Sequence, residues 1–231
     1  MSRVDPRLSG ALTAHASVVA SLSVGHSLRT QGPLRTLLFA ALGGGIPFLG
    51  ELLAIQVLGL LRHRVRPQVW GVPLAIALGW FNVGYNVFAV TEHFLTRAGE
   101  GERLAAPIAA LAATDLDLLL DACGLDLGLW EWNNGGSYAT EIVGPNGNRG
   151  VPAFNFAGWI WMISSITHAY LRLAPEGPRP AGARGPALLL LSYYLPAAAW
   201  AMGRRRRKYL IYSAPFLAAL LAALKDPSGN P

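Results

Sequence analysis

Four acidic residues lie inside apolar stretches of this sequence, where a charged side chain is costly. Glu51 occurs within PFLGELLAIQVLG, and Asp115, Asp117 and Asp121 occur within ATDLDLLLDACG. An ionisable group at the centre of a bilayer costs about 2.5–3.5 kcal/mol on insertion scales, so such residues usually mark a functional site. These four carboxylates are therefore the first candidates for chemistry.

The spacing of the aspartates separates a pair from a single residue. Asp117 and Asp121 are four residues apart and project from one face of a helix. Asp115 points almost the opposite way, because two residues turn a helix by about 200°. Two close carboxylates in an apolar pocket do not ionise together readily, so one should keep its proton and be able to protonate an apolar substrate. The alternative is a pair that is hydrogen-bonded across helices and serves packing alone.

The composition around these residues is that of a membrane protein. The chain has 231 residues, of which 52% are hydrophobic and 14% charged, whereas about 25% is usual in soluble domains. A transmembrane helix needs about 20 mostly apolar residues. We therefore predict an all-α, polytopic bundle of about seven transmembrane helices, forming one domain over residues 1–231. The expected spans are about 9–28, 34–61, 70–95, 104–125, 152–173, 186–203 and 209–224. The first is the weakest, being rich in Ala and Ser, and an amphipathic surface helix or a signal anchor is the alternative.

The basic residues fall in short runs between these stretches. RHRVR (62–66) and RRRRK (204–208) are the clearest, and no aromatic-studded basic face of the kind that binds nucleic acid is seen. Such runs are typical of loops that flank spans. Eleven of the 19 Lys and Arg residues lie on the side of the N-terminus. We therefore expect an inner-membrane protein with a cytoplasmic N-terminus and an external C-terminus.

Several kinds of cofactor chemistry lack their sequence signatures. No two histidines have the i, i+3 or i, i+4 spacing of a di-iron site, and no GxGxxG follows a strand. The only lysines, Lys208 and Lys225, lie at the two ends of the last span, so a Schiff-base lysine in mid-helix is missing. The lone Cys123 allows no internal disulfide and no cysteine metal cluster. We expect no metal and no cofactor.

Two further stretches carry a family resemblance. DLLLDACGLDLGLWEW (117–132) is similar to the pattern D-L-x-x-D-P followed by G-x-W-x-W, and YATEIVGPNGNRGVPAFNFAGW (138–159) is similar to Y-x-G-[IV]-P-x-x-N-F-x-G-W. WGVPLAIALGW (70–80), after Glu51, resembles an earlier block of the same family. This is the carotenoid C-1′ hydratase family of integral membrane "carotenoid biosynthesis proteins", which includes γ-carotene/lycopene and bisanhydrobacterioruberin hydratases. The resemblance extends over roughly residues 34–215 and is strongest in 114–160.

The resemblance implies addition of water across the terminal C-1′,2′ double bond of a ψ-end C40 carotenoid. Asp117 and Asp121 would be catalytic, with Glu51 as a third carboxylate. The residues expected to bind the substrate are Trp80, Trp130, Trp132, Tyr138, Asn155 and Trp159. Tryptophans can stabilise a cation, but Trp130 and Trp132 could equally belong to an interfacial aromatic belt. Asn155 could position the water or cap a helix start.

Two departures from the family pattern leave other functions open. Ala122 replaces the proline that follows the second aspartate, which removes a kink able to aim that carboxylate. The segment 139–149 is longer than expected and reads as an inserted loop, which we interpret as a lid in preference to a docking loop. The main alternative is a non-catalytic, pigment-binding subunit of a larger membrane complex. A transporter with Asp117 and Asp121 as a proton relay is a weaker one.

Overall fold

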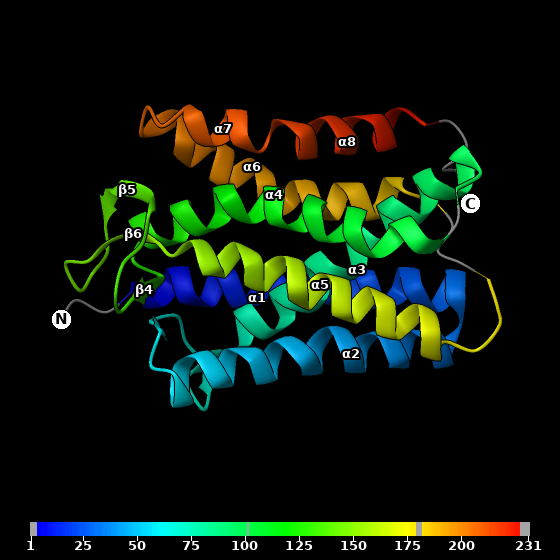
Figure 1. The fold of residues 1–231 in the computed structure, drawn as a ribbon, viewed down its shortest axis with the longest axis horizontal. Helices are drawn as coiled ribbons and strands as arrows, with labels where there is room; N and C mark the ends of the chain where they lie inside the picture. The colour runs from blue at the N-terminus through cyan, green and yellow to red at the C-terminus, as the bar shows by residue number, and fades with distance from the viewer. Residues whose placement is uncertain (1–3, 101, 179–181, 227–231) are drawn as a thin grey trace.

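The computed structural model describes residues 4–100, 102–178 and 182–226, and it is a bundle of long helices (Figure 1). The helices in chain order are α1 (Pro6–Gln31), α2 (Pro33–Leu52), α3 (Leu74–Ala98), α4 (Ala105–Asp126), α5 (Ala153–Leu173), α6 (Arg184–Gly203), α7 (Lys208–Tyr212) and α8 (Ala214–Lys225). A π-helical turn, Leu53–Val57, continues α2, and a short 3₁₀ turn, Glu102–Leu104, precedes α4. The predicted all-α bundle is confirmed.

Helix ends follow the local chemistry of the sequence. Asp5 accepts a hydrogen bond from the backbone N–H of Arg7 at 2.8 Å and so caps α1, which begins at Pro6. A glycine in the left-handed region, Gly99 with φ of 71°, ends α3. These signals explain why most helix bounds lie within a few residues of those expected. The expected span 34–61 is wrong at its end, because the helix with its π turn stops at Val57 and residue 61 lies in a short strand.

The helices differ in their suitability for crossing a membrane. Within the described residues, four helices are long and apolar enough to cross a bilayer, namely α1, α2 with its π turn, α3 and α6. The helix α4 carries four aspartates, and the last apolar run is divided at Ser213 into α7 and α8. The count of seven spans therefore stays a prediction.

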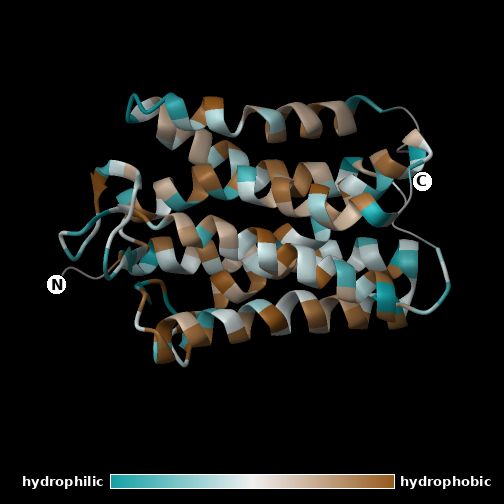
Figure 2. Ribbon diagram, in the orientation of Figure 1, coloured by the Kyte–Doolittle hydropathy of each residue, from teal (hydrophilic) through white to brown (hydrophobic). Residues whose placement is uncertain are grey.

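The surface supports a place in the membrane. Leucines on the outside of α2 are strongly exposed, Leu34 at 63%, Leu37 at 67% and Leu49 at 66%. Figure 2 shows hydrophilic residues mostly toward the two ends of the bundle, with apolar residues along the helices between them. An apolar band of this kind is suited to lipid contact.

Small strands close one end of the bundle. Strand β1 (Leu61–His63) pairs antiparallel with β4 (Trp130–Trp132), with Leu61 opposite Trp132 and His63 opposite Trp130. The short strands β2 (Gln68–Val69) and β3 (Val72–Pro73) form a second pair. We call the β1–β4 pair the ribbon. It ties the α2–α3 connection to the α4–α5 connection.

The segment 139–149 is a β-hairpin and not an irregular loop. Strand β5 (Tyr138–Val143) pairs with β6 (Arg149–Val151), and only the turn between them contains the Gly, Pro and Asn residues that favoured a loop. Ile142 is fully buried and belongs to the core, which anchors the hairpin. Glu131, between Trp130 and Trp132 in β4, is 3% exposed and lies 3.5 Å from Arg64.

Candidate functional site

The two aspartates of the predicted pair do lie side by side in α4, and a residue of α5 links them. Asp117 and Asp121 are 5% and 2% exposed. The side-chain amide of Asn155 donates to Oδ2 of Asp117 at 2.9 Å and to Oδ2 of Asp121 at 2.7 Å. Because α5 begins after the extended Pro152, Asn155 lies in its first turn. The Asn155 side chain is thus a bridge between the carboxylates and not a helix cap.

The ribbon supplies a second donor to this pair. The indole Nε1 of Trp130 donates to Oδ1 of Asp121 at 2.5 Å. The Trp130 ring can approach α4 because residue 124 is glycine, and a Cβ there would collide with the six-membered part of that ring. Trp132, from the same strand, is 5% exposed. Trp130 therefore contacts the aspartate pair, and Trp132 beside it is buried within the protein.

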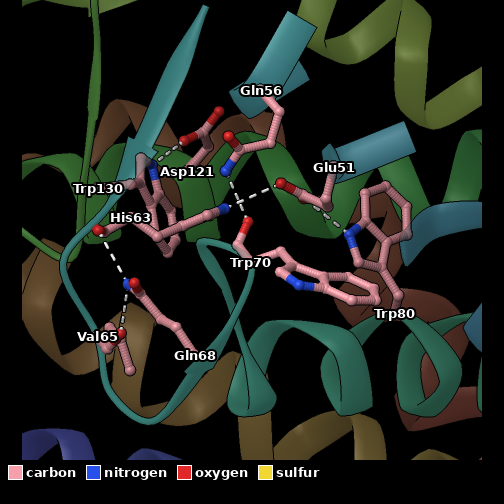
Figure 3. A network of polar contacts seen from close by, with 9 residues as sticks. All are labelled: Glu51, Gln56, His63, Val65, Gln68, Trp70, Trp80, Asp121 and Trp130. Atoms are coloured by element: carbon pink, nitrogen blue, oxygen red, sulfur yellow. Dashed lines mark hydrogen bonds and ion pairs between the residues drawn. The ribbon is translucent and has the colours of Figure 1, made fainter. Parts of the chain in front are cut away.

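Glu51 reaches the site from the end of α2 and is held by two donors. Its Oε2 lies 2.9 Å from Nε2 of His63 in β1, and its Oε1 accepts a hydrogen bond from Nε1 of Trp80 in α3 at 3.0 Å (Figure 3). Glu51 and His63 are each 8% exposed. The Trp80 ring in turn stacks on Trp159 of α5, with ring centroids 3.7 Å apart. Glu51 directly precedes Leu52 and the π-helical turn, a feature often found at functional sites.

These groups surround a cavity of about 70 Å³. At about 30 Å³ per water molecule, this volume accommodates roughly two waters or a small end group of a longer molecule. The lining residues come from α2, α3, α4, α5 and the ribbon, namely Glu51, Leu61, His63, Ile76, Trp80, Asp117, Asp121, Trp130, Trp132, Asn155 and Trp159. The site thus combines three buried carboxyl groups with four indole rings.

Eight of the nine residues selected from the sequence line this cavity, and Tyr138 does not. The Tyr138 hydroxyl donates to the backbone oxygen of Leu118 at 2.7 Å, so it fastens the start of the hairpin to α4. Asp115 also lies away from the cavity, as its place on the helix predicts.

Ala122 does not disturb the site. It is fully buried, and α4 continues past it without a break to Asp126. The position of the Asp121 carboxylate is fixed by Trp130 and Asn155. A proline after Asp121 is therefore not needed to orient that carboxylate.

His63 was not among the residues predicted from the sequence. This histidine lies within the basic run RHRVR, which is typical of a charged loop that flanks a membrane span. The available signal was the alternation of β1, in which Leu61 and His63 are buried and Arg62 between them is exposed. Three residues are too few to distinguish such a strand from a loop.

A comparison with protein families gives a match over most of the chain. A family model described as "Carotenoid biosynthesis protein" matches residues 13–224. No match was found among curated proteins or among solved structures. The matched segment contains all of the cavity's lining residues. The chain therefore belongs to the carotenoid biosynthesis protein family and has a role in carotenoid biosynthesis.

Proposed function

We propose that this protein is a carotenoid hydratase, which adds water across the terminal C-1′,2′ double bond of a ψ-end carotenoid. The observation that carries this proposal is the Asp117–Asn155–Asp121 bridge in a small, indole-lined cavity. Buried paired carboxyl groups supply an acid and a base without a redox cofactor. The membership in a carotenoid biosynthesis family supports a carotenoid as the substrate.

The reaction has two steps. An acid transfers its proton to C-2′, and the π electrons of the double bond form the new C–H bond, leaving a tertiary carbocation at C-1′. The oxygen of a water molecule then bonds to C-1′ and loses a proton to a carboxylate. The net change is the addition of one water, and the proton returned to the carboxyl pair restores the acid.

The hydrogen bonds distinguish the aspartate that donates the proton from the one that stabilises the cation. Both oxygens of Asp121 accept a hydrogen bond, from Trp130 and from Asn155, which favours its ionised form. In Asp117 only Oδ2 accepts one within the described part of the chain, so Oδ1 can carry a proton. We assign Asp117 as the proton donor and Asp121 as the carboxylate that stabilises the cation and accepts the proton of water. Asn155 keeps the two close enough for the proton to return to Asp117.

The indoles and Glu51 complete the assignment. Trp80, Trp130, Trp132 and Trp159 present aromatic rings to the cavity, where they can stabilise a cation. Glu51 adds a third carboxylate whose oxygens are already held by His63 and Trp80. Because the cavity holds only about 70 Å³, the end group alone enters it, and the rest of the polyene lies outside.

Expression in a host that accumulates a ψ-end carotenoid, such as lycopene or γ-carotene, tests this function. We expect a new product whose mass exceeds that of the substrate by one water, and no such product with the matched Asp117→Asn variant. If the carotenoid co-purifies unchanged with the wild-type protein, the pigment-binding alternative is favoured and the hydratase proposal fails.

A further inference from the structure

A second, larger cleft lies on the other side of the ribbon. It has a volume of about 1070 Å³. Apolar atoms form most of its surface, and the polar side chains of Arg62, Arg64, Gln68, Glu131 and Asn133 line part of it, with Ser9 and Gly10 of α1. It occupies the end of the bundle where the N-terminus and the basic run 62–66 lie. This cleft, which we call the polar cleft, and the small cavity of the site have two lining residues in common, Leu61 and His63. The side chains of β1 therefore form the wall between them.

His63 is the polar member of this wall. Its Nε2 faces Glu51 on the side of the site, whereas Nδ1 is buried and has no hydrogen-bond partner among the described residues. Gln68 fixes the backbone beside it by donating to the carbonyl oxygens of His63 at 3.0 Å and Val65 at 2.8 Å (Figure 3). A buried ring nitrogen without a partner is a place where a water molecule is expected.

A hydratase has a requirement that this arrangement meets. Each turnover consumes one water molecule, which must reach carboxylates buried among apolar helices. Four indole rings line much of the remaining cavity wall, those of Trp80, Trp130, Trp132 and Trp159. An indole offers water only its N–H group, and the N–H groups of Trp80 and Trp130 already donate to Glu51 and Asp121. The polar cleft is wide enough for many waters.

We propose that the polar cleft is the route by which water reaches the site. Each water passes the wall by hydrogen bonding to Nδ1 of His63, the ring nitrogen that Glu51 does not contact. This inference rests on the proposed hydratase function. His63 is a positioning residue in this scheme: it directs the water to the cation at C-1′, and Asp117 and Asp121 carry out the proton transfers.

Blocking the route has a chemical signature. Protonation at C-2′ still occurs, but a cation that meets no water loses a proton and returns to the alkene. In deuterium oxide the Asp117 carboxyl group exchanges its proton between turnovers, which needs only occasional contact with solvent, whereas hydration needs a water molecule beside the short-lived cation. The recovered, unhydrated carotenoid therefore carries deuterium at C-2′. The ratio of deuterium exchange to hydration therefore rises, whereas general damage to the site lowers both reactions together.

The first test closes the cleft with a thiol reagent. Gly10 is exposed, and a side chain built there meets nothing within 4 Å. In a Cys123→Ala background, the Gly10→Cys protein should be active until a bulky maleimide is attached, and labelling should then raise the exchange-to-hydration ratio. The control is Arg207→Cys, an exposed position at the same end but outside the cleft, where labelling should have no effect. A labelled Gly10→Cys protein that hydrates at the unlabelled rate would refute the route.

The second test addresses the wall. His63→Phe keeps a ring but removes both nitrogens, and we expect the ratio to rise on the order of tenfold, as for loss of one hydrogen bond to the reacting water. His63→Gln keeps an amide that can bond Glu51 and water, and should retain a ratio near that of the wild type. If His63→Phe lowers exchange and hydration equally, His63 is only structural and the proposal fails. A wild-type protein that neither exchanges nor hydrates would instead refute the hydratase function itself.

Discussion

The two aspartates of α4 differ in what their oxygens contact. Asp121 is held at both oxygens by Trp130 and Asn155, whereas Asp117 is held at one. In the proposed mechanism this difference, and not the spacing alone, assigns Asp117 as the acid and Asp121 as the carboxylate that stabilises the cation. The assignment leads directly to a test by substitution.

We expect Asp117→Asn and Asp121→Asn each to reduce hydration by about 10²–10⁴-fold, the contribution typical of general acid–base catalysis. An amide keeps the size of the side chain, so the protein should still insert and purify. Asp115→Asn, on the same helix but away from the cavity, is the matched control. Near-normal product from both site variants would remove this pair from the mechanism.

The sequence predicted this pair because a helix places residues four apart on one face. It could not decide the role of Asn155, since the bridge depends on how α5 lies against α4, and the alternatives of cap and ligand fit the same residue type. His63 was missed for a related reason: its partner Glu51 is 12 positions away and in another element. The sequence therefore predicted the residue types of the site but not the contacts between residues of different elements.

At the scale of elements, the ribbon holds the Trp130 ring against α4. The apolar runs predicted the helices, because helix length and composition follow from the sequence alone. The three short strand pairs were not predicted, since strands of two to six residues carry too weak a pattern. The hairpin β5–β6 was likewise read as a loop from its Gly, Pro and Asn residues, which form only its turn.

Gly124 of α4 lies directly against the Trp130 ring of the ribbon. We expect Gly124→Ala to displace the Trp130 ring, break its bond to Asp121, and cost about 1–3 kcal/mol of stability through overpacking. Hydration should fall at the same time. Gly45→Ala in α2, where a Cβ meets nothing within 4 Å, is the control. We would measure the thermal unfolding temperature in detergent and the yield of hydrated product. If Gly124→Ala equals the Gly45→Ala control in both measurements, the ribbon does not hold Trp130 against α4.

The hairpin is joined to α7 by a pH-dependent contact. Burial alone would raise the pKa of Glu141, but hydrogen bonds from Tyr209 and Lys208 outweigh it and lower the pKa from 4.5 to about 2. A lowered pKa means that the contact stabilises the fold fully above about pH 4.5 and loses this effect as the pH falls toward 2. Because this carboxylate is 40% exposed, the effect is small.

The Glu141→Gln variant tests this contact. Its thermal unfolding temperature should be below that of the wild type at pH 6, and the difference should shrink steadily as the pH falls below about 4.5. A difference that stays constant from pH 6 down to the lowest pH tolerated would show that Glu141 does not act through its charge.

At the scale of the whole molecule, the two ends of the bundle differ. The N-terminus, the ribbon, the hairpin and the α6–α7 turn all lie at one end, and the C-terminus lies at the other (Figure 1). The first end collects the basic runs 62–66 and 204–208 as well as the site. From the positive-inside rule we expect the site to lie near the cytoplasmic surface.

We therefore expect single cysteines at the two ends to react on opposite sides of the membrane. In a Cys123→Ala background, Arg207→Cys should be protected from an impermeant thiol reagent in intact cells and react after lysis. Glu176→Cys, in the exposed connection after α5, should react in intact cells. The reverse pattern would invert the topology, and reaction of both in intact cells would mean that the ends do not lie on opposite sides.

The source of the new oxygen atom tests the central claim most directly. The purified protein is incubated in detergent with a ψ-end carotenoid and a chelator, without nucleotide or flavin, in water labelled with oxygen-18. A parallel sample contains ordinary water and labelled dioxygen. A hydratase must place the label of water in the product hydroxyl and must work equally well without oxygen. Label from dioxygen would show a hydroxylase, and recovery of unchanged carotenoid in both samples would show that the three buried carboxyl groups do not perform hydration.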